Sequence, residues 1–426
     1  MDIKLRPFRR FRSNLFWIVL NETMGKGALF VTNVYLARKL GTEAFGYYSI
    51  YQSIVLCFWL AADLGTGMYA IREIARDREN CASLVCNIQN LRFCSGFATL
   101  ALFEAMAMLK PNVSERETLA YMGLYLLFFT IYPEWILRGL EQFKYLLLGT
   151  LVSSAIYLIG VIALVNNAED LKHASWLWST SFLFAAIALF FIVKKLVRVS
   201  FSFQYNGREW LNHVKKSIWF SASGGLLAIN LHLPIILLNY TSSVGDVGAF
   251  SAVYRTVLSI SNAGVLIPTA MYPIISQAFD NEKEQFYELI KFLELATLSL
   301  GLLLAGVMFL FSNDLVVKLF GRDYSLALNS WRILVWLVPL RFLRYVYGYS
   351  FGASNKLHFY IFPLAISTCI VGLAVLVARN FIGLTSISYI VVSGEAFISA
   401  TSLLMFRRIS YSKSLPERTL GSKRRV

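Results

Sequence analysis

The chain has 426 residues, of which 57% are hydrophobic and 15% are charged, whereas soluble globular proteins carry about 25% charged residues. This composition excludes a cytosolic enzyme, a nucleic-acid-binding module, a disulfide-stapled secreted domain and a disordered chain. Apolar stretches of about 20 residues recur along the whole sequence, and each is long enough to cross the ~30 Å hydrocarbon layer of a bilayer. The sequence therefore predicts an all-α integral membrane protein.

The apolar stretches predict about 12 transmembrane helices joined by short loops. Lys and Arg gather before the first span, in alternate loops and after the last span, which is the distribution expected of cytoplasmic segments. Both termini are therefore predicted to be cytoplasmic, and much of the net charge of +15 is explained without nucleic acid. The predicted spans are 14–36, 45–70, 84–109, 118–136, 143–165, 174–197, 217–240, 248–275, 286–311, 330–351, 357–378 and 381–406.

The longest loop predicts a division into two six-helix lobes. The N-terminal lobe covers 1–200 and the C-terminal lobe 201–406, and a basic cytoplasmic tail follows at 407–426. The loops leave no room for an extramembrane catalytic domain, and neither a P-loop nor an HExxH motif is present. We therefore expect a protein that is not an enzyme, with no catalytic residues, no metal site and no cofactor.

A weak internal repeat relates the two predicted lobes. An offset of 202 residues aligns Gly46 with Gly248 and Tyr48 with Phe250, at the start of the second helix of each lobe. Parallel repeats of this kind occur in transporters whose lobes are related by an axis along the membrane normal and enclose a central binding site. The repeat therefore predicts a pseudo-symmetric pair of lobes.

Polar residues inside the spans share helical faces. In the first span Asn21, Glu22 and Lys26 lie on one face, and Phe16 and Met24 lie on the opposite face. Five further spans have similar polar faces, which predicts a shared hydrated cavity; helix packing through small polar residues is the alternative. The polar residues predicted to line this cavity are Asn21, Gln52, Gln89, Ser259 and Asn262.

Charged residues within the spans indicate the sign of the charge on the cargo. A charge at mid-bilayer costs at least ~2.5 kcal/mol, so each must face protein or water. Guanidinium groups stay charged when buried and bind phosphate in a bidentate fork, which favours an anionic cargo. For Arg92 and Arg255, snorkelling to the membrane edge is the alternative. The predicted substrate-binding cations are Lys26, Arg92, Arg255, Arg341 and Arg344.

Three carboxylates within the spans are candidates for coupling transport to a proton or sodium gradient. These are Glu22, Asp63 and Glu395. The alternative for Glu22 is an internally neutralised pair with Lys26, four residues along the helix, that serves packing alone.

Two segments of the first lobe resemble a known family. LARKLGTEAFGYYS (Leu36–Ser49) and DLGTGMYAIREIAR (Asp63–Arg76) resemble the N-terminal signature of bacterial polysaccharide flippases, the O-antigen transporters of the multidrug/oligosaccharidyl-lipid/polysaccharide exporter superfamily. VGAFSAVYR (Val247–Arg255) resembles the corresponding segment of the second half. The cavity cations of the family would fall on Lys26, Arg92, Arg255 and Arg341.

This resemblance implies a MATE-like, two-lobed bundle that opens alternately to the cytoplasm and the periplasm. Its cargo would be an undecaprenyl-diphosphate-linked oligosaccharide, an O-antigen or other surface polysaccharide repeat unit, moved from the cytoplasmic to the periplasmic leaflet of the bacterial inner membrane. The implied partners are this lipid-linked oligosaccharide, membrane lipids and other polysaccharide-assembly membrane proteins.

Two other functions remain open at this point. A multidrug antiporter of the same superfamily would favour cationic drugs and an acidic cavity, and the arginine excess argues against it. A polytopic lipid-linked glycan polymerase or ligase would need a long periplasmic loop for its catalytic residues, and the loops here are short.

Overall fold

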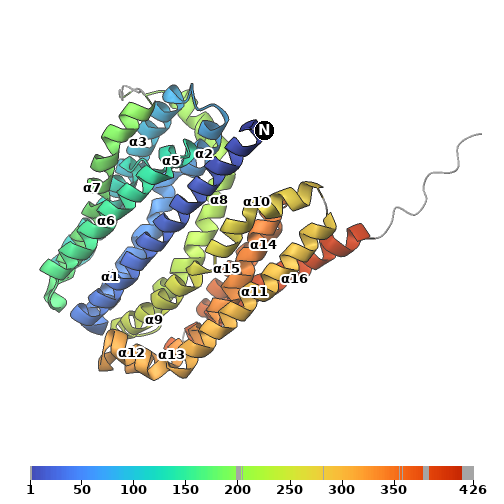
Figure 1. The fold of residues 1–426 in the computed structure, drawn as a ribbon. Coiled ribbons are helices and arrows are strands. Elements are labelled where there is room, and N and C mark those ends of the chain that lie inside the picture. Colours follow the sequence, from blue (N-terminus) through green and yellow to red (C-terminus); the bar gives the residue numbers. More distant parts are fainter. Residues whose placement is uncertain are drawn as a thin grey trace, which may run out of the picture.

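The computed structural model describes residues 2–197, 203, 205–281, 283–354, 356, 358–377 and 383–414. Within these ranges all regular secondary structure is helical, which confirms the all-α prediction. Figure 1 shows two helical bundles that lie side by side. The predicted boundary between the lobes, at residue 200, and the end of the basic tail, 415–426, fall outside the described residues.

The N-terminal half is built around a long first helix. Helix α1 (Asp2–Asp63) is interrupted at Gly41, whose φ of 73° places it in the left-handed region that glycine adopts without strain. This interruption lies between the first two predicted spans. The other elements of this half are α2 (Thr66–Arg76), α3 (Ala82–Ala107), α4 (Val113–Ile131), α5 (Glu134–Gly139), α6 (Phe143–Leu164), η1 (Ala168–Asp170) and α7 (Leu171–Val197).

The C-terminal half has more breaks between its helices. Its long helices include α8 and α15, which contain Pro234 and Pro363, residues that remove a backbone donor and permit a bend. The elements of this half are α8 (Gly207–Leu238), α9 (Val244–Ala263), α10 (Leu266–Asn281), α11 (Lys283–Leu310), α12 (Ser312–Phe320), η2 (Arg322–Ala327), α13 (Leu328–Leu334), α14 (Leu337–Ala353), α15 (His358–Val377) and α16 (Leu384–Ser414).

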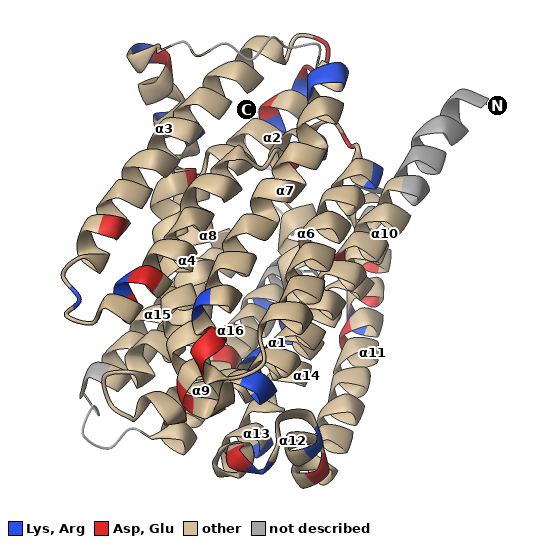
Figure 2. Cartoon of the chain, turned by 90° about the vertical axis from the view of Figure 1, so that its left-hand side faces the viewer, with Lys and Arg blue, Asp and Glu red and all other residues tan. Residues whose placement is uncertain are grey.

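Among the described residues, eight helices are long and apolar enough to cross a membrane, or up to ten if each of two bent pairs forms one span. The predicted number of twelve is therefore not confirmed. One of the eight is the 50-residue segment Asn14–Asp63, which covers two predicted spans. Helix α3, which matches another predicted span, is not among them, and it carries the polar residues Gln89 and Arg92. Figure 2 shows long stretches of helix without charge, interrupted by few charged positions.

The two halves meet mainly where α1 packs against α9. Buried apolar residues of both helices, including Phe45 and Val55 of α1 and Phe250 and Val257 of α9, belong to one hydrophobic core. On the outer face of α1, Phe16 and Met24 are exposed, as expected of side chains that face lipid. The predicted polar and apolar faces of the first span therefore point in different directions in the folded chain.

Candidate transport site at the junction of the two halves

A cavity of about 250 Å³ lies between α1 and the α9–α10 segment. We call it the junction cavity. Four of its lining residues, Glu22 and Lys26 from α1 and Ser259 and Asn262 from α9, are predicted site residues that the fold brings together from opposite halves. The remaining lining residues are Thr23, Gly27, Phe30, Ile260, Ala263 and Leu266.

Charged side chains of α1 and α5 form a network on one side of the junction cavity. Lys26 Nζ lies 2.9 Å from Glu22 Oε2, and Arg138 Nη2 lies 3.9 Å from Glu22 Oε1. Arg138 also donates from Nε to Glu134 Oε1 at 2.6 Å. All four side chains are about one-third exposed, so the network is accessible to water and carries no net charge.

Sequence analysis missed Arg138 and Glu134. Both belong to α5, a six-residue helix that begins just after Pro133, and the predicted fourth span ended at residue 136. The available signal was their spacing of four residues, which on a helix predicts an ion pair.

Arg255 of α9 crosses from the C-terminal half to α1. Its guanidinium donates to the side-chain oxygen of Gln52 and, at 3.3 Å, to the carbonyl oxygen of Ser49. The guanidinium carbon also lies 6.0 Å from the centre of the Tyr48 ring, within the range of a cation–π contact. None of the ion pairs found between described residues includes Arg255, so its known partners are neutral.

The partners of Arg255 are themselves held by a hydrogen-bonded chain. Gln52 Nε2 donates to the Tyr48 hydroxyl at 3.0 Å, and the hydroxyls of Tyr48 and Tyr157 lie 2.5 Å apart. Tyr48 and Gln52 are buried. Because buried polar groups with partners on several sides are costly to displace, this chain fixes the Gln52 amide toward Arg255.

Arg92 and Asp63, predicted for different roles, pair with each other. The Arg92 guanidinium and the Asp63 carboxylate form a buried ion pair between α3 and α1. The guanidinium carbon of Arg92 also lies 5.9 Å from the ring of Trp135. On the same helix, Gln89 donates to the carbonyl of Thr130 at 3.0 Å. These three predicted residues therefore join helices within the N-terminal half.

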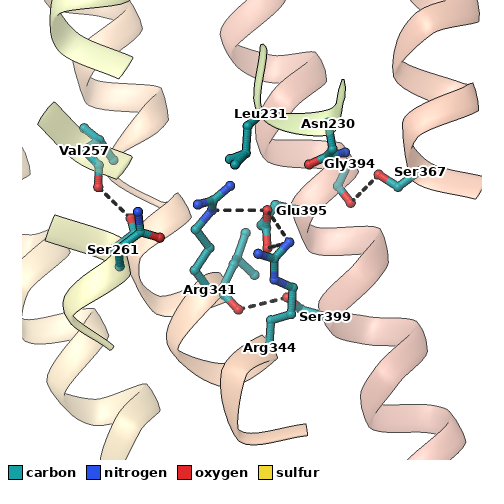
Figure 3. A network of polar contacts seen from close by, with 12 residues as sticks. Asn230, Leu231, Val257, Ser261, Arg341, Arg344, Ser367, Gly394, Glu395 and Ser399 are labelled. Atoms are coloured by element: carbon teal, nitrogen blue, oxygen red, sulfur yellow. Dashed lines mark hydrogen bonds and ion pairs between the residues drawn. The ribbon is translucent and has the colours of Figure 1, made fainter. Parts of the chain in front are cut away.

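Arg341, Arg344 and Glu395 form a buried triad in the C-terminal half (Figure 3). Arg341 Nε lies 3.3 Å from Glu395 Oε2, and Arg344 Nη1 lies 3.0 Å from Glu395 Oε1. The three side chains are 2–4% exposed, and the triad carries one net positive charge. It connects α14 to α16, and none of its members lines the junction cavity.

A second cavity, of about 200 Å³, lies within the N-terminal half between α1, α6 and α7. Hydroxyl groups line it, among them those of Thr150, Ser153, Ser154 and Ser181, and the carboxylate of Glu134 reaches it. Sequence analysis did not identify this cavity, because the serines of α6 and α7 are embedded in strongly apolar spans. Asn21, which was predicted to line a cavity, is buried on α1.

Two helical bundles with a cavity at their junction form a multi-pass membrane protein of MATE-like fold. A structure described as the inward-facing conformation of a multidrug resistance MATE family transporter matches with a TM-score of 0.73, covering 93% of this chain and 96% of that one at 14% identity. The outward-facing conformation of such a transporter matches with a TM-score of 0.63 at 16% identity, covering 96% and 97%. The inward closed conformation of the lipid II flippase MurJ matches with a TM-score of 0.70 at 11% identity, covering 93% and 87%.

Sequence comparison identifies the family. Residues 11–279 match the model of the family described as "Polysaccharide biosynthesis protein", and the chain belongs to this family. A "Putative O-antigen transporter" of Escherichia coli (strain K12) is 26% identical over 348 residues, which are 78% of this chain and 80% of the relative. A "Putative O-antigen transporter" of Shigella dysenteriae is 22% identical over 307 residues, covering 70% and 75%. The predicted family is confirmed, and the chain is a transporter and not an enzyme.

Proposed function

We propose that this chain moves an oligosaccharide linked to undecaprenyl diphosphate, an O-antigen or other surface polysaccharide repeat unit, across the bacterial inner membrane. Movement runs from the cytoplasmic to the periplasmic leaflet by alternating access, with both termini in the cytoplasm. A diphosphate and several sugars cannot cross lipid unaided, because each unpaired hydroxyl costs on the order of 4 kcal/mol in hydrocarbon. The family and the names of the relatives support this cargo class.

The observation that carries the proposal is the set of partners of Arg255. Arg92, Arg341 and Arg344 are buried in ion pairs with carboxylates, so a phosphate would have to displace a charged partner to bind them. Arg255 is held by an amide and a backbone carbonyl, and it lies one turn from Ser259 in the junction cavity. Among the predicted cations, Arg255 is therefore the best placed to bind a diphosphate, and Lys26 lines the junction cavity beside its partner Glu22.

The charge of the junction cavity disfavours a drug antiporter as the alternative. A cationic drug would need a free carboxylate, and Glu22 is the one carboxylate among the described residues that line the cavity. Glu22 already contacts Lys26 and Arg138.

We propose Glu22 as the coupling residue, since Asp63 and Glu395 are bound in buried ion pairs away from this cavity.

A flipping assay in proteoliposomes tests the proposal. Fluorescent undecaprenyl-diphosphate-linked oligosaccharide is placed in both leaflets, and periodate added outside oxidises only the outer pool. We expect the protein to make the inner pool accessible, and Arg255→Ala to abolish this exposure at normal reconstitution. Equal accessibility with and without protein would refute the proposal.

A further inference from the structure

The close contact between α1 and α9 is made by two glycines that the internal repeat relates. A methyl group on Gly46 would overlap the carbonyl oxygen of Val244, and one on Gly248 would overlap the carbonyl oxygen of Thr42. The offset of 202 residues aligns Gly46 with Gly248 and Thr42 with Val244. The contact of Gly46 with Val244 and that of Gly248 with Thr42 are therefore equivalent under the internal repeat. Glycine at both positions lets the helix backbones touch, as small residues do in membrane interfaces.

This crossing lies beside the break at Gly41, at the opposite end of the bundle from the start of α1 (Figure 1). Two further contacts join the halves at the same end. Arg38 donates to the carbonyl of Lys318 at 2.6 Å, and the Tyr324 hydroxyl donates to the carbonyl of Ala37 at 2.7 Å. With both termini in the cytoplasm, this closed end faces the periplasm.

Arg255 lies between this closed end and the junction cavity. It follows Gly248 by about two helical turns, and its bonds to Ser49 and Gln52 span the same two helices as the glycine crossing. On its other side Ser259, which lines the junction cavity, donates to the Arg255 carbonyl at 2.9 Å. A group entering the cavity from the cytoplasm would therefore reach Arg255 before it reached the crossing.

We propose that Arg255 is a positioning residue that holds the periplasmic end closed through Gln52 and Ser49, and that an anionic group of the cargo opens this end by taking the place of Gln52. The identity of that anion rests on the proposed function. A phosphate is a stronger acceptor than an amide because the bond is then charged on both sides. No carboxylate has to leave Arg255, which distinguishes it from the paired arginines at Asp63 and Glu395.

A disulfide cross-link between α1 and α9 measures whether the periplasmic end is closed. A Cβ on Gly245 would lie 3.6 Å from the Thr42 hydroxyl oxygen, so the side chains of cysteines at these two positions would be in contact across the crossing. The full chain, with its five native cysteines replaced by serine, carries Thr42→Cys and Gly245→Cys in proteoliposomes. The rate of disulfide formation with copper phenanthroline then reports how long the periplasmic end stays closed.

Three variants separate the contributions to closure. Gln52→Leu should slow cross-linking roughly tenfold, the effect expected from the loss of one hydrogen bond to a charged group. Gly248→Ala should slow it as well, because the new methyl group has no room. Gly306→Ala is the matched control, since nothing lies within 4 Å of a Cβ there, and it should cross-link at the parent rate. Cross-linking of Gln52→Leu at the parent rate would overturn the proposal.

A comparison of undecaprenyl diphosphate with undecaprenol tests whether an anionic group replaces Gln52 as the partner of Arg255. The diphosphate should slow cross-linking of the parent and have no further effect on Arg255→Gln, and undecaprenol should affect neither. Equal effects on both proteins, or none on the parent, would overturn the exchange. The slow cross-linking of Gln52→Leu needs no cargo, so it would persist even if the flipping assay refuted the proposed function.

Discussion

The hydroxyl of Tyr345 donates a hydrogen bond to Asn262 Oδ1 at 2.6 Å, and this contact joins the buried triad to the junction cavity. Tyr345 is adjacent in sequence to Arg344, whose guanidinium carbon lies 5.5 Å from the Tyr345 ring. Asn262 lines the cavity. The cavity wall is therefore hydrogen-bonded directly to the helix that carries two buried arginines.

Tyr345→Phe removes only the hydroxyl of this link. We expect a loss of about 1 kcal/mol in the free energy of unfolding, the usual contribution of one hydrogen bond, with slower flipping because Asn262 is no longer oriented. Thermal unfolding and the flipping assay measure the two effects. Tyr240→Phe, an exposed tyrosine, is the control, and equal flipping by both variants would show that the link has no role in transport.

Glu395→Gln leaves two buried arginines without their carboxylate. Removing one partner of a buried ion pair costs about 3–5 kcal/mol, so the thermal unfolding midpoint of the purified protein should fall sharply. Glu73→Gln is the control, because Glu73 pairs with exposed Arg72 and Arg76 and such surface pairs contribute at most about 1 kcal/mol. A similar midpoint for the two variants would contradict the importance of the triad for stability.

Arg255→Ala should reduce surface polysaccharide export strongly, because both a charge and a fork of donors are lost. Arg255→Lys should restore export only in part, since an ammonium keeps the charge without the bidentate geometry. Lipopolysaccharide profiles of complemented cells, normalised to protein level, measure export. Arg332→Ala, on the exposed side of α13, should export normally. Normal export by Arg255→Ala would remove the main support for a cationic site that binds an anionic cargo.

Glu22→Gln should slow flipping and flatten its dependence on pH, because it removes the carboxylate that lines the junction cavity and nearly preserves the volume of the side chain. The assay is run across a range of pH values on both sides of the membrane. Glu117→Gln provides the comparison, since Glu117 pairs with Lys172 at an exposed position outside the cavity. An unchanged rate and pH profile would assign Glu22 to packing with Lys26 and Arg138.

Topology is checked with reporter fusions at two described positions. Green fluorescent protein fused after Arg407 should fluoresce, and alkaline phosphatase inserted after Ser242 should be active, because positive charge gathers on the cytoplasmic side. Loss of fluorescence at Arg407 would place the end of α16 in the periplasm and invert the proposed direction of transport.

The helices and the polar face of α1 could be predicted because they depend on local sequence patterns. Hydropathy marks apolar spans, and the spacing of Asn21, Glu22 and Lys26 identifies a face without reference to the rest of the chain. The glycine positions Gly46 and Gly248 were also found, because the repeat aligns them. Their contact was not predicted, since an alignment relates positions and says nothing of which helices cross.

The pairing of charges could not be predicted from the sequence. Arg92 and Asp63 are 29 residues apart and Arg344 and Glu395 are 51 apart, and helical periodicity does not extend over such separations. Counting cations against carboxylates treats every charge as equally available. The fold removes most of them from the junction cavity and leaves Arg255 with neutral partners.

The order of partners along the chain has a consequence for biogenesis. Gln52 precedes Arg255 by 203 residues, so a chain synthesised from its amino terminus has the acceptor in the bilayer before α9 emerges. The triad has the opposite order, because Glu395 is made 51 residues after Arg344. Until then α14 holds two arginines that each cost at least ~2.5 kcal/mol in hydrocarbon, so its retention in the membrane depends on a helix that is not yet made.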